Sequence, residues 1–466
     1  MTTVHEQGEN WISCVKGAPD VILKRCRYEM EEDKIVPLTR ERRTEIEAEI
    51  TRMSARALRV LAGAYRELQT GKMPDGKREK QVGQLEQNLI FLGLAGMMDP
   101  PREAAAGAVE AFRRASVRTV MITGDHADTA LAIARQLGIA KRREECMTGA
   151  QLETLDEGAL EERIGSVSVF ARVSPEHKVR IVRALKRAGC VTAMTGDGVN
   201  DAPALKSADI GIAMGKGGTD VARQAADMIL TDDNFATIER AIEEGRGIYE
   251  NIRKSILFLL SSNLGEILTM FAAVAIGIPA PLGAGHILWI NLITDSLPAL
   301  ALGMERAEAD IMQRRPRDAK AGVFAGGMGF DIAYQGLLVS ILTLMSYFVG
   351  HFIESGVWEI TNSPDGTTMA FVTMSMAEIF HSFNMRSEHS VLKLGLFSNR
   401  KLVAACGLCA FLMVSVVLFP PLAALFKTTA LTFSQWLLVA ALSLCPLLVV
   451  EGEKLLWERL PRKRKT

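Results

Sequence analysis

The sequence predicts an α/β region with a parallel sheet, followed by a bundle of six transmembrane helices. Up to about residue 250, short apolar runs alternate with charged, helix-forming stretches, whereas long apolar runs separated by brief polar loops follow. Apolar residues make up 48% of the 466-residue chain, and its formal net charge is zero. A chain of this charge gives no reason to expect a nucleic acid as partner.

The second half contains six stretches that are long enough, or nearly so, to cross a bilayer. A spanning helix needs about 20 mostly apolar residues. The predicted spans are Ile252–Ile278, Ile287–Gly303, Ile332–Gly350, Thr368–Met385, Leu402–Phe419 and Phe433–Val450. An even number of spans returns the carboxyl terminus to the side from which the first span starts.

The charges of the loops predict the orientation of these spans. Fifteen lysines and arginines lie between spans two and three, between spans four and five, and after span six, whereas the opposite loops hold only Lys427. Because basic residues accumulate on the cytoplasmic side of short loops, the first half and the carboxyl terminus are expected in the cytosol. The chain is therefore predicted to be a multi-pass integral membrane protein, with the lipid bilayer as partner.

Several polar side chains interrupt the apolar spans. An ionisable residue inside a bilayer is costly and commonly faces a partner or an ion path. The spacing of these residues places them on single helical faces within three of the spans: Asn263 and Glu266 in the first, Asn291, Thr294 and Asp295 in the second, and Glu378 with His381 and Asn384 in the fourth. Carboxylate, amide and hydroxyl oxygens are the ligands that Ca²⁺ prefers. Interhelical hydrogen bonds are the alternative explanation.

In the first half, apolar strands and amphipathic helices alternate, which predicts parallel strands joined by crossover helices. The predicted strands are Arg118–Thr123, Val167–Ala171, Val191–Thr195, Ile210–Ala213 and Met228–Leu230. The predicted helices are Arg102–Ala115, Ala127–Leu137, Pro175–Ala188 and Thr219–Ala226. In such a sheet, ligands bind beyond the carboxyl ends of the strands.

Two strand ends carry residues suited to phosphate chemistry. The first is Thr123-Gly124-Asp125, and the second is the run Thr195 to Asp201. Glycine permits close approach of the backbone to a phosphate, and an aspartate can hold Mg²⁺. Lys178, near the start of a predicted helix, offers a positive charge for phosphoryl oxygens. A lone Thr-Gly-Asp is usually an ordinary turn, so the longer run carries most of this argument.

The run TGDGVNDAPALK, from Thr195 to Lys206, resembles the hinge motif of P-type ATPases. Other segments are similar to further motifs of the same family, so the resemblance covers nearly the whole chain. They are Asp99–Arg102 at the entry to the phosphorylation domain, Met121–Asp125 at its nucleotide-contacting turn, Lys178 as its phosphate-binding lysine, Lys16–Pro19 as the adenine-site motif, and Arg59 within Leu58–Ala62 as an ATP-binding arginine.

This resemblance implies a haloacid-dehalogenase-like (Rossmann-like) α/β phosphorylation domain, incomplete, and part of an α+β nucleotide-binding domain. The implied domains are 1–98, the partial nucleotide-binding domain; 99–235, the phosphorylation domain; 236–254, a stalk helix; 255–450, six transmembrane helices; and 451–466, a basic cytosolic tail.

The resemblance also implies roles for individual residues, with ATP as substrate and Mg²⁺ as cofactor. Asp197 would coordinate Mg²⁺, Asn200 would contact the phosphoryl group, and Lys178 would stabilise its charge. Asp201 would secure the hinge rather than touch substrate. Five residues would help bind nucleotide: Lys16, Arg59, Thr123, Gly124 and Asp125.

Within the family, Ser262–Glu266 and Trp289–Asp295 are similar to the ion-binding helices of endoplasmic-reticulum-type calcium pumps. This similarity implies a calcium site built by Asn263, Glu266, Thr294, Asp295 and Glu378. Asn291 and Asp295 would contribute to a second site. Relatives that export Na⁺ or H⁺ use similar positions, so these ions remain alternatives to Ca²⁺.

The family mechanism also uses an Asp-Lys-Thr-Gly-Thr segment, and no such segment occurs in this sequence. In the family, the aspartate of that segment ends the central strand of the phosphorylation-domain sheet. The strands beside it are therefore expected to have unpaired edges, which would weaken the domain. We expect a pump whose amino-terminal segment is supplied in cis or in trans, with this chain inactive by itself. A non-catalytic remnant and a membrane-tethered phosphatase of the same fold are the alternatives.

Overall fold

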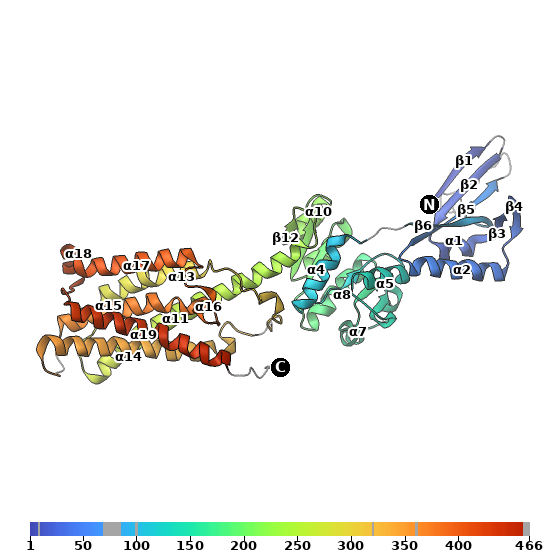
Figure 1. Cartoon of the computed structure of the whole chain (residues 1–466). Helices are drawn as coiled ribbons and strands as arrows, with labels where there is room; N and C mark the ends of the chain where they lie inside the picture. Colours follow the sequence, from blue (N-terminus) through green and yellow to red (C-terminus); the bar gives the residue numbers. More distant parts are fainter. Residues whose placement is uncertain (8–9, 69–84, 98–100, 319–320, 359–361, 460–466) are drawn as a thin grey trace. The chain divides into compact units, whose positions relative to one another are not determined.

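The computed structural model describes residues 1–7, 10–68, 85–97, 101–318, 321–358 and 362–459. The chain divides into two compact units, one of residues 1–240 and 312–319, and the other of residues 241–311 and 320–466. Figure 1 labels helices and strands of both units. Some residues used in the predictions lie outside the described residues. They are Asp99 and Pro100 of the predicted domain entry, Lys320 and the basic residues 462–465.

The first unit begins with a six-stranded sheet in the order β1-β2-β5-β6-β3-β4, in which β3 and β6 are parallel and the other pairs antiparallel. Two helices contribute Ile22, Leu23 and Ile46 to the apolar cluster on this sheet. The strands are β1 (Thr2–Gln7), β2 (Asn10–Gly17), β3 (Cys26–Glu31), β4 (Lys34–Pro37), β5 (Arg59–Leu68) and β6 (Leu89–Met97), and the helices are α1 (Pro19–Arg25) and α2 (Arg40–Ala55).

Two parallel three-stranded sheets follow in the same unit, in the orders β7-β9-β8 and β10-β11-β12. The strands are β7 (Met121–Ile122), β8 (Cys146–Thr148), β9 (Val169–Ala171), β10 (Ala193–Gly196), β11 (Ile210–Met214) and β12 (Met228–Leu230). All five predicted strands are present, although β7 is much shorter than predicted. They pair in parallel within two separate sheets rather than in the single predicted sheet. Strand β8 was not predicted, because a three-residue strand carries little sequence pattern.

The helices of this region confirm the predicted alternation. The four predicted helices correspond to α4 (Glu103–Arg114), α5 (Ala127–Gln136), α8 (Pro175–Arg187) and α10 (Asp220–Ala225), and the helices not predicted are α6 (Gly149–Glu153), α7 (Glu157–Ile164) and α9 (Ala202–Ser207). Helix α8 begins where it does because the Ser174 hydroxyl accepts the His177 backbone N–H and Pro175 occupies the first helical position. This start places Lys178 in the first turn.

In the second unit, four described helices are long and apolar enough to cross a membrane: Thr237–Ile276, Ala325–Ser355, Arg400–Leu418 and Phe433–Leu456. The remaining elements include the two other predicted spans. The elements are α11 (Thr237–Ile276), α12 (Ala284–Trp289), the π-helix η3 (Ile290–Asp295), α13 (Ser296–Leu302), α14 (Met328–Ser355), α15 (Pro364–His381), η6 (Asn384–Arg386), α16 (Val391–Leu394), α17 (Arg400–Leu418), α18 (Pro420–Phe426) and α19 (Phe433–Arg459).

Helix α11 contains both the predicted stalk and the first predicted span. Its 40 residues give a length of ~60 Å at 1.5 Å per residue, about twice the thickness of a bilayer core. The second predicted span is not one regular helix, because η3 interrupts it between α12 and α13. The fourth predicted span is α15, an 18-residue helix whose buried polar residues, among them Thr373 and Ser375, lower its apolar character.

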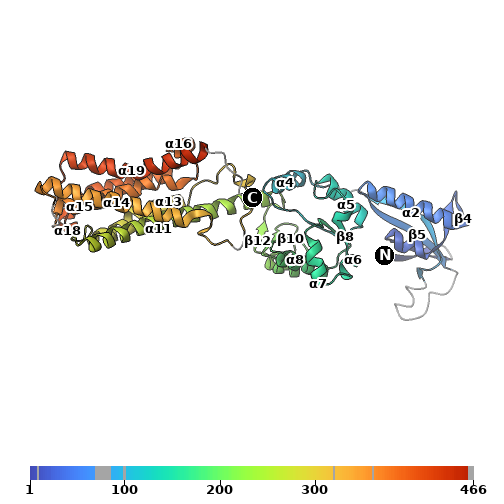
Figure 2. The ribbon, with the colours of Figure 1, turned by 90° about the horizontal axis from the view of Figure 1, so that it is seen from below.

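Helix α15 lies against α14, α17 and α19 (Figures 1 and 2). Glycines allow close approach between these helices. A Cβ atom at Gly350 would lie 2.9 Å from the Cα of Gly366, and one at Gly336 would lie 2.9 Å from the carbonyl oxygen of Ser261. Small residues at helix contacts are typical of membrane bundles. The close contact of α14 with α11 helps fix the segment of α11 that carries Glu266.

Candidate functional site

Three buried carboxyl groups lie in the second unit, on three different elements. Glu266 comes from α11, Asp295 from the end of η3 and Glu378 from α15, and their side chains are 5%, 1% and 1% exposed. The three groups interact electrostatically with one another. We call Glu266, Asp295 and Glu378 the carboxylate cluster.

The hydrogen bonds of the carboxylate cluster leave part of it unsatisfied. The amide nitrogen of Asn291 lies 3.0 Å from both carboxylate oxygens of Glu266, and the Ser262 hydroxyl donates to Asp295 Oδ1 at 3.3 Å. Among the described residues, Asp295 Oδ2 and both carboxylate oxygens of Glu378 have no hydrogen-bond partner. A buried carboxylate without a partner is costly, so this arrangement suits a bound cation.

The backbone around Asp295 is irregular. The π-helix η3 runs from Ile290 to Asp295, and Pro298 lies in the following helix α13. Single π-turns within helices are frequent at functional sites. Because η3 carries Asn291, Thr294 and Asp295, the irregular segment coincides with the polar residues that the sequence singles out.

Two of the predicted ligands bond to the backbone of their own elements. The Asn263 amide nitrogen donates to the Leu259 carbonyl oxygen at 2.7 Å, and the Thr294 hydroxyl donates to the Ile290 carbonyl oxygen at 3.0 Å. These bonds use donor groups only. The amide oxygen of Asn263 and the lone pairs of the Thr294 hydroxyl can still accept or ligate.

His381 and Asn384, predicted on the same side of the helix as Glu378, belong to an interhelical network. His381 Nε2 lies 3.1 Å from Gln335 Oε1, and Asn384 Nδ2 lies 3.1 Å from both His381 Nδ1 and the Pro446 carbonyl oxygen. For these two residues, the alternative explanation of interhelical hydrogen bonds accounts for the polar side chains.

In the first unit, the turn after β10 brings together three of the predicted site residues. Lys178 Nζ lies 2.6 Å from Asp201 Oδ1, and Asp201 Oδ2 accepts the backbone N–H groups of Asp197 and Gly198 at 3.3 and 3.1 Å. Asp201 is only 7% exposed, whereas Asp197 and Asn200 are exposed. Asp201 therefore holds the turn, and the Asp197 and Asn200 side chains remain accessible to a ligand.

The turn after β7 is closed by its own side chains. The Thr123 hydroxyl donates to Asp125 Oδ2 at 3.0 Å and accepts the Asp125 backbone N–H at 3.1 Å. A Cβ atom at Gly124 would meet nothing within 4 Å, so space surrounds this residue. Ile122 packs against the apolar cluster that contains Met194 of β10, which joins the two three-stranded sheets.

Lys16 and Arg59 lie on the six-stranded sheet and are exposed. Lys16 of β2 pairs with Gly63 of β5, and Arg59 lies four residues before Gly63 on the same strand. Because side chains alternate between faces along a strand, Lys16 and Arg59 lie on the same face. The core residues Val15 and Ala62 occupy the other face.

Sequence reasoning missed Ser262 and the π-helix. Ser262 lies four residues before Glu266 on α11, so helical spacing could have placed it on the same face. A serine within an apolar span is common, however, and its contact with Asp295 depends on how α11 packs against η3. The π-turn has no sequence signature of its own.

Two family models match the chain. "P-type ATPase, cytoplasmic domain N" matches residues 1–104, and "Cation transporting ATPase, C-terminus" matches residues 279–456. These matches show that the chain carries domains of P-type cation-transporting ATPases. Its similar relatives include "Calcium-transporting ATPase 1" of Bacillus cereus, 45% identical over 98% of this chain and 52% of that protein.

Two further relatives extend this comparison. "Calcium-transporting ATPase" of Bacillus subtilis is 43% identical over 97% of this chain and 50% of that protein. "Probable cation-transporting ATPase F" of Mycobacterium tuberculosis is 40% identical over 98% of this chain and 50% of that protein. The chain thus spans about half the length of the curated relatives it matches.

Proposed function

We propose that this chain supplies the ion-binding and phosphate-handling parts of a pump that couples ATP hydrolysis to Ca²⁺ transport across a membrane. The observation that carries the proposal is the carboxylate cluster, in which buried oxygens of Asp295 and Glu378 have no hydrogen-bond partner among the described residues. Three carboxylates that share a buried space repel one another unless they bind protons or a cation lies between them. The names of the relatives, which are calcium-transporting ATPases, favour Ca²⁺ as that cation.

The proposed ion site uses the carboxylate cluster together with neighbouring neutral oxygens. Ca²⁺ takes about six to eight oxygens, more than three carboxylates offer if each binds through one oxygen. Asn263, Thr294 and Asn291 lie on the same elements as Glu266 and Asp295 and can supply the remainder. In this proposal, one site is formed by Asn263, Glu266, Thr294, Asp295 and Glu378. A second site includes Asn291 and Asp295. Na⁺ and H⁺ are the alternative transported ions.

The proposed phosphate chemistry belongs to the turn after β10 in a haloacid-dehalogenase-like domain. The exposed Asp197 carboxylate would hold Mg²⁺, which offsets charge on the transferred phosphoryl group. Asn200 would contact that group, and Lys178 would stabilise its charge. Lys178 already lies beside Asp201, so the phosphoryl group would share or displace this ion pair.

The proposed ATP site combines groups from two sheets of the first unit. Lys16 and Arg59 would bind nucleotide on their shared face of the six-stranded sheet. Thr123, Gly124 and Asp125 would help position nucleotide at the turn after β7, where no neighbouring atom crowds Gly124. Positive side chains and an uncrowded glycine suit a phosphate-bearing ligand.

The phosphorylated aspartate would come from the pump's amino-terminal segment, in cis or in trans. Among the described residues, β7 pairs only with β9, and β10 pairs only with β11. Each strand therefore has one edge without a strand partner, and an unpaired edge can accept a further strand. A parallel strand carrying the aspartate could use these edges, which supports the proposed partnership.

We further propose six transmembrane spans with the first half and the carboxyl terminus in the cytosol. The four long apolar helices supply four of the spans. The α12–η3–α13 segment and α15 would supply the other two, both carrying ion-site residues. The fifteen basic residues on one set of loops support this orientation.

The experiment measures phosphoenzyme formation from labelled ATP, with and without Ca²⁺. The purified chain would be tested alone and with the amino-terminal half of a relative such as the Bacillus cereus protein. We expect Ca²⁺-dependent label only when both parts are present. Label on this chain alone would contradict the assignment of the aspartate to another segment.

A non-catalytic remnant is the second candidate function, favoured by the missing Asp-Lys-Thr-Gly-Thr motif in this sequence. Such a chain would bind nucleotide, cation or a membrane partner without turnover. As a control, the same amino-terminal half is combined with the matching half of its own protein, where phosphoenzyme should form. If that control is labelled and this chain with the same complement is not, the result would select this candidate.

A further inference from the structure

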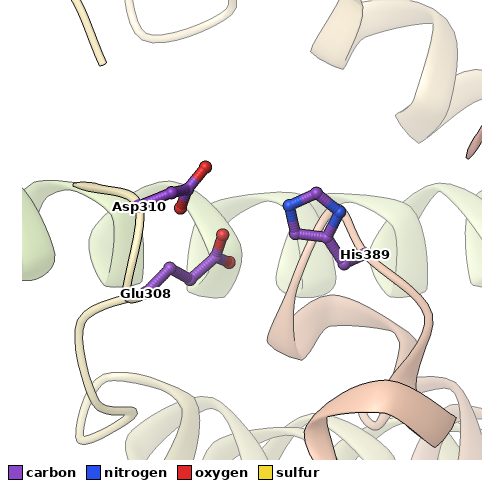
Figure 3. A group of neighbouring side chains, drawn as sticks. All are labelled: Glu308, Asp310 and His389. Atoms are coloured by element: carbon purple, nitrogen blue, oxygen red, sulfur yellow. The ribbon is translucent and has the colours of Figure 1, made fainter. Parts of the chain in front are cut away.

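A second group of ligand-type side chains lies in the second unit, on elements other than those of the carboxylate cluster. Glu308 and Asp310 lie in the loop after α13, and His389 lies in the loop after η6 (Figure 3). One ligand atom from each residue lies within 4.8 Å of the other two, and all three residues are half-buried. Two carboxylates from one loop and an imidazole from another thus lie close together.

A buried ion pair holds these two loops together. The Arg386 side chain, 0% exposed, donates to both carboxylate oxygens of Glu305 at 2.9 and 3.1 Å. Arg386 also donates to the carbonyl oxygens of Gly395 and Leu396 at 3.0 and 3.1 Å. Glu305 lies three residues before Glu308, and Arg386 lies three residues before His389. The ligand residues are therefore held near one another by a bidentate contact that does not include them.

Cations already lie near these side chains, because the ammonium groups of both Lys254 and Lys454 interact electrostatically with Glu308. Lys254 Nζ is 3.3 Å from Glu308 Oε1, and both side chains are 11% exposed. This ammonium group offsets one negative charge but offers no coordination geometry. A divalent ion would bind Glu308 in competition with Lys254, so the lysine should weaken metal binding without preventing it.

We propose that Glu308, Asp310 and His389 form a binding site for a divalent transition-metal ion. The imidazole decides the metal class, because Zn²⁺, Mn²⁺ and Co²⁺ accept mixed nitrogen and oxygen ligands whereas Ca²⁺ takes oxygen ligands. The bound ion would join the loop after α13 to the loop after η6. These loops follow α13 and η6, which come after the elements that carry Asp295 and Glu378, yet the metal site itself does not depend on calcium transport.

The test is equilibrium binding of Zn²⁺ to the purified, chelator-treated chain in detergent, performed at saturating Ca²⁺. We expect one zinc equivalent to be lost, or to bind at least about tenfold more weakly, in His389→Gln and in the double variant Glu308→Gln/Asp310→Asn. His5→Gln, which changes an exposed histidine of β1, should retain that equivalent. Zinc binding that is equal in the wild-type chain and in both site variants would overturn the proposal.

Two further measurements separate metal binding from altered folding. Lys254→Gln should tighten Zn²⁺ binding severalfold, because it removes the competing ammonium group; a merely structural cluster would not respond in this way. In the wild-type chain, Zn²⁺ should protect His389, and not His5, from acylation by diethylpyrocarbonate. Unaltered acylation of His389 in saturating Zn²⁺ would contradict the assignment of this histidine as a ligand.

Discussion

The carboxylate cluster and the turn after β10 handle buried negative charge in opposite ways. In the turn, Asp201 is paired with Lys178 at 2.6 Å and accepts two backbone N–H groups. In the cluster, Asp295 receives one hydroxyl, and neither oxygen of Glu378 has a hydrogen-bond partner among the described residues. Asp201, Asp295 and Glu378 are all buried carboxyl groups, but only Asp201 has hydrogen-bond or ion-pair partners for both of its oxygens.

This difference indicates what each region needs from outside the protein. A satisfied carboxylate such as Asp201 stabilises its own turn and leaves binding to its exposed neighbours, Asp197 and Asn200. An unsatisfied buried carboxylate such as Glu378 raises the free energy of the empty site and favours any cation that can reach it. This difference is consistent with the proposed ion binding by the cluster and with a structural role for Asp201 in its turn.

The largest expected effect is on calcium binding. Glu378→Gln keeps the shape of the side chain but removes a charge that lies beside Asp295. Loss of one partner of a buried charge pair costs about 3–5 kcal/mol, so calcium binding should weaken about a hundredfold or more. Equilibrium binding of radioactive Ca²⁺ measures this change. Glu354→Gln, a carboxylate that bonds Ser363 instead, is the matched control. If calcium binding weakened equally in Glu378→Gln and Glu354→Gln, the carboxylate cluster would not differ from other carboxylates in binding Ca²⁺.

The next effect is on the stability of the second unit. Arg386→Met leaves Glu305 without its buried bidentate partner, which should cost about 3–5 kcal/mol. Thermal unfolding of the purified chain measures the loss. Because two apolar residues can replace a buried ion pair, Glu305→Met/Arg386→Met should recover part of the stability. A double variant less stable than Arg386→Met would show that the pair is not the source of the effect.

A smaller effect distinguishes two glycines of the first unit. A Cβ atom at Gly196 would lie 2.4 Å from the Asp201 Cβ atom, whereas one at Gly124 would meet nothing within 4 Å. Gly196→Ala should therefore destabilise the turn after β10 by about 1–3 kcal/mol through overpacking, and Gly124→Ala should leave stability nearly unchanged. Denaturant unfolding of the two variants tests this difference, and equal losses would contradict the close approach of Asp201 to β10.

The smallest expected effect is a pH dependence in the first unit. Burial would raise the pKa of the Asp209 carboxyl, but hydrogen bonds from Thr192 and Lys186 outweigh it and lower this pKa. A group with a lowered folded pKa stabilises the fold above its unfolded pKa of about 3.9, and this contribution is lost as pH falls further. Asp209→Asn should reduce the difference in unfolding midpoint between pH 7 and pH 3.

The exposed Asp220 serves as the matched control for that experiment. It forms an ion pair with Arg223 one helical turn away, and its side chain is 83% exposed. Exposed pairs of this kind contribute little to stability. Asp220→Asn should therefore leave the acid dependence unchanged, and an effect as large as that of Asp209→Asn would contradict the role of the Thr192 and Lys186 contacts.

Much of the fold could be predicted from local patterns. The strands around β9 to β12 and the helices between them follow from apolar alternation and from caps such as Ser174-Pro175. Glu266, Asp295 and Glu378 were identifiable because charged residues are rare within apolar runs. Helical spacing alone grouped Asn263 with Glu266 and Asn291 with Asp295.

The remaining features depend on tertiary contacts that a single sequence does not reveal. The Arg386–Glu305 ion pair joins residues far apart in the chain, and nothing in either loop indicates the partner. The π-turn at η3 and the bond from Ser262 to Asp295 depend on how α11 packs against this segment. Spacing placed His381 on the same helical side as Glu378, yet its hydrogen bond to Gln335 of α14 places it in an interhelical network.

The most direct test of the account is an experimental structure of this chain with Ca²⁺ bound. We predict an ion between the carboxylates of Glu266, Asp295 and Glu378, with Asp201 still paired to Lys178. The central claim would be contradicted if, at saturating Ca²⁺, the carboxylate cluster held no ion and calcium were found only at Glu308 and Asp310.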